Sequence, residues 1–136
     1  MRAFLDTNVL IYSVSTLPEE RPRRDRARGL LESADWAISV QVLQEFIRQS
    51  TRAGRAGALS LDQALEFVSV WRTFPIQETT LNLLDQGLEL LRRHRFSFWD
   101  AMIVAAAIAQ GCEILYTEDM QHGRIVEGTH IVDPFR

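Results

Sequence analysis

Lysine is absent from this sequence of 136 residues, and all 15 positions counted as Lys or Arg are arginine. A Walker-type phosphate-binding loop, a lysine Schiff base and lysine-assisted phosphoryl transfer at a strand-end aspartate are therefore excluded. Genomic base composition is sufficient to explain the absence, so it limits the chemistry without indicating a function.

Cysteine and long apolar runs are also scarce. The single cysteine, Cys112, cannot form a disulfide within the chain, which favours a reducing compartment. The apolar stretch Met102–Ala109 is far shorter than the roughly 18 residues that span a membrane, and no apolar signal segment follows Arg2. We therefore expect a cytoplasmic protein that is not embedded in a membrane.

Length and patterning predict one α/β domain. A chain with 46% hydrophobic residues and this length can bury one core but is too short for two ordinary domains, so we expect one domain over residues 1–136. Short apolar runs alternate with helical patterns, which is typical of a parallel sheet covered by helices. The expected strands are 3–5, 37–39, 75–77, 114–116 and 130–132. The formal net charge of −3 gives no general argument for binding nucleic acid.

Several helices can be located from their ends and their apolar spacing. Ser60 and Gln63 form a capping box, and Ser97 and Gly111 bound an almost wholly apolar helix. The charged stretch 15–29, with two prolines, predicts a loop that runs into an exposed helix. Two apolar stripes are expected to face the core: Leu61, Ala64, Leu65, Val68 and Trp71, and Leu81, Leu84, Leu88 and Leu91.

Four acidic residues occupy positions where an open parallel sheet binds its ligands. Asp6 ends the first strand and Asp119 follows the fourth. Glu45 and Asp100 lie in helices that begin at the same edge of the sheet. Taken singly, each of these acids also has an ordinary structural explanation. Asp6 and Asp100 suit helix N-termini, Glu45 suits a solvated helix face and Asp119 suits the start of a turn.

Together these carboxylates indicate a cation. Several carboxylates at close range repel one another, which raises some of their pKa values unless a proton or a cation neutralises them. Oxygen ligands suit Mg²⁺ or Mn²⁺, whereas the scattered His94, His122 and His130 show no zinc-ligand spacing. A divalent cation with open water positions activates water for attack on a phosphodiester, so the pattern favours metal-assisted hydrolysis of phosphate esters.

The segments FLDTNVLIY, VLQEF, FSFWDAMIVAAA, ILYTEDMQHG and VDPF carry a family resemblance. In this order they resemble PIN-domain ribonucleases, and specifically VapC-type toxins of bacterial toxin–antitoxin pairs, over essentially the whole chain. The metal-binding and catalytic residues implied by the resemblance are Asp6, Glu45, Asp100 and Asp119. It also implies that Asn8 and Thr117 orient a carboxylate or a water. Glu118 is an alternative to Asp119 if the turn is rotated.

The resemblance implies a fold, an activity and partners. The fold is a single PIN-like domain with a central parallel sheet of about five short strands and helices on both faces. The activity is endonucleolytic cleavage of RNA with Mg²⁺ or Mn²⁺. The partners are a small VapB-like antitoxin, which blocks the acidic pocket, and a second copy of the chain in a homodimer.

Basic and aromatic residues are candidates for RNA contacts. Two arginine clusters are candidates for phosphate binding: Arg21, Arg23, Arg24, Arg26 and Arg28, and Arg92, Arg93 and Arg95. Acidic residues are interspersed with the first cluster, so a solvated charged helix face is the alternative. The rings of Trp71 and Trp99 can stack on bases, but their positions in helices predict packing instead.

Two other functions are compatible with the sequence. The same chemistry can act on DNA, as in the related flap nucleases, although the chain lacks helical clamp insertions. A noncatalytic protein-binding module would use the four acids only as caps and solvated residues, and Mg²⁺ or Mn²⁺ would not stabilise it.

Overall fold

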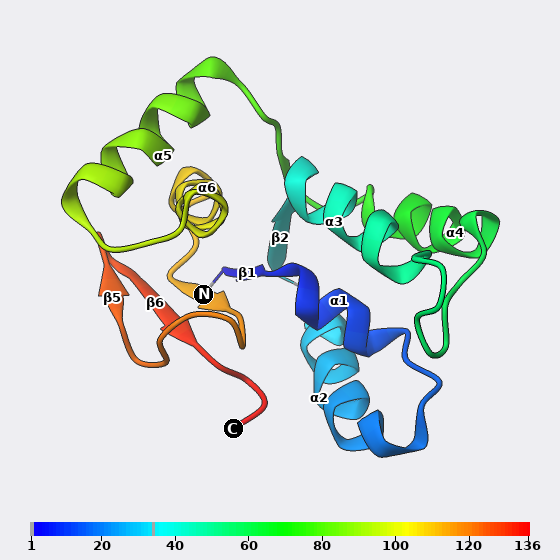
Figure 1. Cartoon of the computed structure of the whole chain (residues 1–136). Helices are drawn as coiled ribbons and strands as arrows, with labels where there is room; N and C mark the ends of the chain where they lie inside the picture. Colours follow the sequence, from blue (N-terminus) through cyan, green and yellow to red (C-terminus); the bar gives the residue numbers. More distant parts are fainter. Residues whose placement is uncertain (1, 34) are drawn as a thin grey trace.

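Six strands form one sheet in the computed structural model, which describes residues 2–33 and 35–136 (Figure 1). The strands are β1 (Ala3–Leu5), β2 (Trp36–Ser39), β3 (Ile76–Gln77), β4 (Ile114–Tyr116), β5 (Ile125–Val126) and β6 (Thr129–Val132). Their order is β3-β2-β1-β4-β6-β5, and every neighbouring pair is parallel except β5 with β6. The predicted α/β class is confirmed, with six strands in place of about five.

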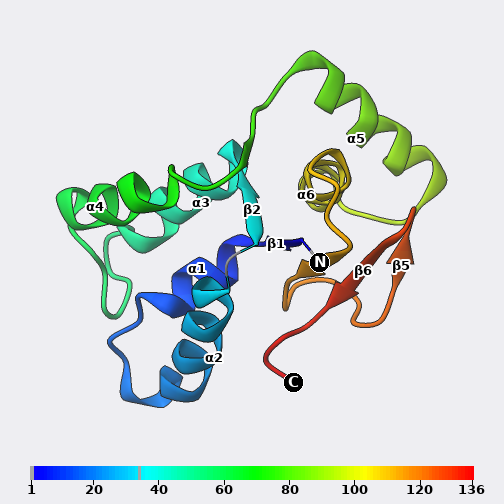
Figure 2. The same cartoon turned by 180° about the vertical axis from the view of Figure 1, so that it is seen from behind.

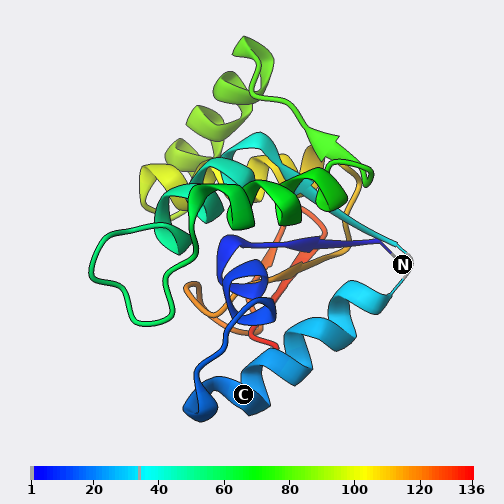
Figure 3. The ribbon, with the colours of Figure 1, turned by 90° about the vertical axis from the view of Figure 1, so that its right-hand side faces the viewer.

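Helices cover both sides of the central strands, as parallel pairing requires. They are α1 (Thr7–Ser13), α2 (Arg21–Glu32), α3 (Val40–Ser50), α4 (Leu61–Trp71), α5 (Leu81–Arg93) and α6 (Phe98–Ala109), with a 3₁₀ helix at Pro18–Glu20. α5 and α6 lie on one side of β1 and β2, and α1 to α4 lie on the other (Figures 1 and 2). Seen from the side, α2 and α5 are at opposite ends of the molecule (Figure 3). None of the helices in the described ranges is long and apolar enough to cross a membrane.

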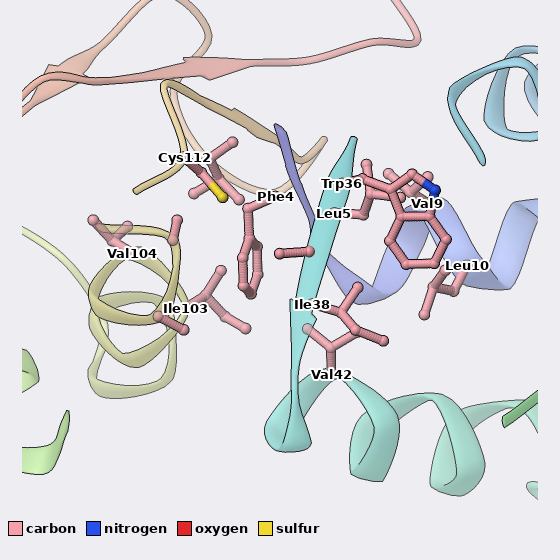
Figure 4. Close-up of a cluster of buried hydrophobic side chains, with 14 of the residues drawn as sticks. Phe4, Leu5, Val9, Leu10, Trp36, Ile38, Val42, Ile103, Val104 and Cys112 are labelled. Atoms are coloured by element: carbon pink, nitrogen blue, oxygen red, sulfur yellow. The ribbon is translucent and has the colours of Figure 1, made fainter. Parts of the chain in front are cut away.

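The core lies where β1 and β2 meet helices from both sides (Figure 4). Phe4, Leu5 and Ile38 of these strands are almost completely buried. Val42 of α3 and Ile103 of α6 belong to the same cluster. Because a central parallel strand is covered on both faces, successive residues of β1 and β2 are apolar rather than alternating with polar ones.

Strand β5 is not predicted by the sequence pattern. It pairs antiparallel with β6 through a turn at Glu127 and Gly128, whose φ angles are 47° and 89°. Two-residue hairpin turns of this kind favour Asn-Gly or Asp-Gly, so Glu-Gly is a weak signal. The strand is also only two residues long.

The ends of α4 and α6 are as predicted. Ser60 and Gln63 form the capping box of α4. Ser97 is the N-cap of α6, and Gly111 follows its last turn with a φ of 67°. The apolar stripe of α4 is only partly buried, since Leu61 and Leu65 are exposed.

The buried face of α5 differs from the predicted stripe. The stripe residues Leu81 and Leu88 are exposed, whereas the buried residues are Leu83, Gly87 and Leu90. At Gly87 a Cβ would overlap the Met102 sulfur of α6. The missing side chain thus lets the two helices pack closely at this point of the buried face.

Candidate active site

Asp6 lies at the junction of β1 and α1, at the carboxyl edge of the sheet. Its backbone is extended, and it is the N-cap of α1 because its Oδ1 accepts a hydrogen bond from Thr7 N at 2.7 Å. Its Oδ2 accepts a hydrogen bond from Thr117 Oγ1 at 2.8 Å, just beyond the end of β4. Asp6 therefore caps α1 and, with the same side chain, lies at the carboxyl end of β1, where parallel sheets bind their ligands.

Burial shifts the ionisation of Asp6. Only 5% of this residue is exposed, and burial is the main cause that raises its pKa from 3.8 to about 7. The hydrogen bonds from Thr117 and Thr7 oppose the rise, whereas the charges of Asp119 and Glu45 add to it. A cation beside such a carboxylate would stabilise its ionised form.

Thr117 and Asn8 connect Asp6 to Asp119. Thr117 is completely buried, and its Oγ1 accepts a hydrogen bond from the Asp119 backbone N at 3.1 Å. Asn8 Nδ2 donates to Asp119 Oδ2 at 3.1 Å and to Thr117 Oγ1 at 3.3 Å. Both side chains thus hold carboxylates in place, which agrees with the orienting role that the family resemblance implies for them.

Glu45 reaches the same group of side chains from α3. Its Oε1 accepts hydrogen bonds from Thr7 Oγ1 at 3.2 Å and from Gln41 Nε2 at 3.4 Å. Thr7 therefore bridges two acids, since its backbone N binds Asp6 and its hydroxyl binds Glu45.

Asp100 approaches from α6. It lies in the first turn of the helix, where Ser97 Oγ accepts a hydrogen bond from its backbone N at 3.3 Å. Partial burial raises the pKa of the Asp100 carboxyl, a hydrogen bond between this carboxyl and the Ser97 side chain lowers it, and the charge of Asp119 raises it further. The structure therefore gathers all four predicted acids at one edge of the sheet, with Asp119 acting on both Asp6 and Asp100.

Glu118 faces away from this group. Its two carboxylate oxygens accept the Tyr12 hydroxyl proton at 2.9 and 3.2 Å. Burial, and then Glu118, raises the pKa of Tyr12 to about 12. Of the two adjacent acids, Asp119 is therefore the one that the structure places with Asp6 and Asp100.

The donor set is chemically suited to a hard divalent cation, because it offers carboxylate oxygens and no histidine or cysteine. Within residues 2–33 and 35–136, however, no three Asp, Glu, His or Cys side chains lie close enough to form a finished ion site. Coordination of one ion by these acids would need the carboxylates to move closer together.

The predicted arginine clusters contain several residues that contact groups other than the four acids. The Arg23 guanidinium, for example, lies 5.7 Å from the centroid of the Tyr12 ring. Arg26 and Arg28 of α2 donate to the backbone carbonyls of Pro134 and Ser13, at 3.2 and 2.9 Å. Arg92 and Arg93 end α5 next to His94, which lies 3.5 Å from Glu127 in the turn before β6. That turn precedes a parallel strand, so it is at the edge of the sheet opposite the acids.

Other arginines, which are not in either predicted cluster, border Glu45. A cavity of about 310 Å³ is lined by Glu45, Arg48, Gln49, Arg52 and Arg55. The spacing of Arg48 three residues after Glu45, on the same helix face, is a signal that could have identified the first of them.

The two tryptophans considered for base stacking differ in exposure. Trp71 is 5% exposed and packs edge-on against Phe46, so its predicted core role is confirmed. Trp99 is 64% exposed, so the prediction of packing was wrong for this residue. The reason is its place in the first turn of α6, before the segment that is covered on all sides.

The fold and the site define a class of protein. It is a mostly parallel α/β protein with an acidic site at the end of β1, the strand that lies between β2 and β4, where the strand order changes direction. Residues 3–127 match the family model of the PIN domain, so the chain belongs to the PIN-domain family. The resemblance read from the five sequence segments is thereby confirmed.

Solved structures with the same fold include toxins and toxin–antitoxin complexes. VapC20 of Mycobacterium tuberculosis, described as a Sarcin-Ricin loop cleaving toxin, is 24% identical with a TM-score of 0.66, covering 86% of this chain and 89% of its own. A toxin–antitoxin complex from Klebsiella pneumoniae contains a chain that is 22% identical, with a TM-score of 0.69 and 97% coverage of both chains. DNA-bound VapBC from Salmonella typhimurium is 21% identical, with a TM-score of 0.66 and 98% coverage of both chains. No curated protein sequence matched this chain.

Proposed function

We propose that this protein is a Mg²⁺- or Mn²⁺-dependent endoribonuclease that acts as the toxin of a toxin–antitoxin pair. The observation that carries the proposal is Asp6, a buried carboxylate at the end of β1 whose ionised form is disfavoured by burial and by neighbouring acids. Structural neighbours described as toxins support the biological role.

Asp6, Glu45, Asp100 and Asp119 would hold the cation. When bound, it would supply charge stabilisation and an activated water for attack on a phosphodiester. The protein's own contribution is positional. Thr7 and Thr117 fix the two oxygens of Asp6, and Asn8 holds Asp119 from the neighbouring strand end.

A small VapB-like antitoxin and a second copy of the chain are the proposed protein partners. The neighbours include a toxin–antitoxin complex and a VapBC assembly bound to DNA, which supports an antitoxin partner for this chain. With cellular RNA as substrate, the proposed place of action is the cytoplasm.

The test is cleavage of a mixed cellular RNA pool by the purified, antitoxin-free protein. We expect discrete fragments with Mn²⁺ or Mg²⁺, none with chelator, and none from Asp6→Asn or Asp100→Asn. Asp85→Asn, an exposed acid on α5, is the matched control and should cleave normally. Cleavage at the parental rate by both site variants would contradict the proposal, and matched DNA oligonucleotides test the DNA alternative.

A further inference from the structure

Two neighbouring cavities follow α3 on either side of Glu45. The first, of about 310 Å³, is lined by Gln41, Gln44, Glu45, Arg48 and Trp99. The second is the arginine-lined cavity described above, and the two share Glu45 and Arg48. We call the pair the α3 groove. It passes one of the four acids, with an aromatic ring at one end and arginines at the other.

The arginine end of the groove carries positive charge that is not paired with carboxylates of the described residues. In the part of the chain that the structure describes, the side chains of Arg48, Arg52 and Arg55 form no ion pair with a carboxylate and no hydrogen bond. A cation in the last turn of a helix suits the helix dipole, which accounts for Arg48. Arg52 and Arg55 lie beyond the C-cap Thr51, so the dipole does not explain them.

The other end of the groove presents an uncovered indole. Trp99 is 64% exposed, while Trp36 and Trp71 are 1% and 5% exposed. Its ring is supported from one side by Phe98, at 4.8 Å between centroids and 85° between planes. Its backbone carbonyl accepts a hydrogen bond from Gln41 Nε2 at 3.3 Å, which ties it to α3. An exposed aromatic ring that packs against a second ring beside a basic groove suits an unstacked base.

We propose that the α3 groove binds a single-stranded stretch of the substrate RNA across the site. Trp99 stacks on a base on one side of the phosphate that is cut, and Arg48, Arg52 and Arg55 contact phosphates on the other side. A single strand is required because the bases of a duplex are not available for stacking on a side chain. The inference rests on the proposed nuclease function, and it assigns RNA contacts to α3 in place of α2 and the end of α5.

The test measures binding of a fluorescein-labelled, mixed-sequence 12-nucleotide RNA in chelator, by anisotropy, over a series of salt concentrations. The triple variant Arg48→Gln, Arg52→Gln, Arg55→Gln should bind at least tenfold more weakly. Its slope of log affinity against log salt should fall by about 2, since each phosphate contact on a single strand contributes roughly 0.7. The triple Arg→Lys variant should retain the slope. A matched triple variant of Arg21, Arg23 and Arg24 to Gln should bind like the parent.

Trp99→Ala should weaken binding by about 5- to 150-fold without changing the salt slope, because stacking does not release counterions. RNA should also quench the tryptophan fluorescence of the parent protein and not that of Trp99→Phe, since the other two tryptophans are buried. Unchanged melting temperatures will show that the surface variants are folded.

Some outcomes would overturn the inference. These are an unchanged salt slope in the α3 triple variant, a loss of binding only in the α2 triple variant, or a Trp99→Ala change confined to oligomeric state in sedimentation. Cleavage that needs metal and Asp6 but is unaffected by the groove variants would contradict RNA binding by the α3 groove and leave the proposed nuclease activity intact. RNA binding that depends on the groove residues, without any cleavage by the parent, would contradict the nuclease activity and leave RNA binding by the groove intact.

Discussion

Replacing Asp6 by asparagine should change stability in opposite directions at low and high pH when no metal is present. The pKa of Asp6 is raised from 3.8 to about 7 in the folded protein, so folding favours its protonated form. Its stabilising contribution is complete below the unfolded pKa and is lost as pH rises from about 4 to above 7. At about 1.4 kcal/mol per tenfold change, the ionised parent loses roughly 4 kcal/mol.

Asparagine removes the charge but fits the hydrogen bonds less well. Asp6 accepts from both Thr7 N and Thr117 Oγ1, and an amide has only one accepting atom. Thr117 already receives hydrogen bonds from Asn8 and from the Asp119 backbone, so it is poorly placed to accept a third. The lost hydrogen bond should cost about 1 to 2 kcal/mol at every pH. We therefore expect Asp6→Asn to be about 0.5 to 1.5 kcal/mol less stable than the parent near pH 4 and about 2 to 3 kcal/mol more stable near pH 8.

Urea unfolding in chelator at intervals between about pH 4 and about pH 8 measures this difference. Asp85→Asn, at an exposed position on α5, should track the parent throughout. A difference in stability between Asp6→Asn and the parent that is the same at both ends of the range would contradict a raised pKa of Asp6 in the folded protein. In a second arm, Mn²⁺ at about 100 times its dissociation constant should raise the stability of the parent by about 2.7 kcal/mol and leave Asp6→Asn much less affected.

Three further substitutions test the supports of the site and the core. Thr117→Val removes the hydroxyl that donates to buried Asp6, so it should lower stability at pH 8 by about 1 to 3 kcal/mol in urea unfolding, and Thr117→Ser should restore it. Phe46→Ala should cost about 3 to 5 kcal/mol because the ring is completely buried, whereas Phe67→Ala, at a 38% exposed ring, should cost much less; equal losses would contradict this core assignment. Gly128→Ala should lower the melting temperature by several degrees, because φ at this turn is 89°, and an unchanged melting temperature would count against the strain.

Local sequence was sufficient to predict the features that depend on neighbouring residues. The caps of α4 and α6 follow from side chains that bond the backbone within three positions, as Ser60 and Ser97 do. The core strands follow from short apolar runs that only a doubly covered sheet can bury. Asp6 could be identified as a candidate site residue because it ends such a strand.

Contacts between distant segments decided the rest. Glu118 is turned away from the site by Tyr12, which is 106 positions earlier in the chain, and no local pattern distinguishes it from Asp119. The buried face of α5 includes Gly87, which lies against Met102 of another helix. Arg26 and Arg28, in the stretch of α2 that is densest in arginine, bond backbone carbonyls, while the sparser Arg48, Arg52 and Arg55 line a cavity with Glu45. Periodicity and capping are encoded within a turn or two, whereas exposure and proximity are set only when the segments pack together.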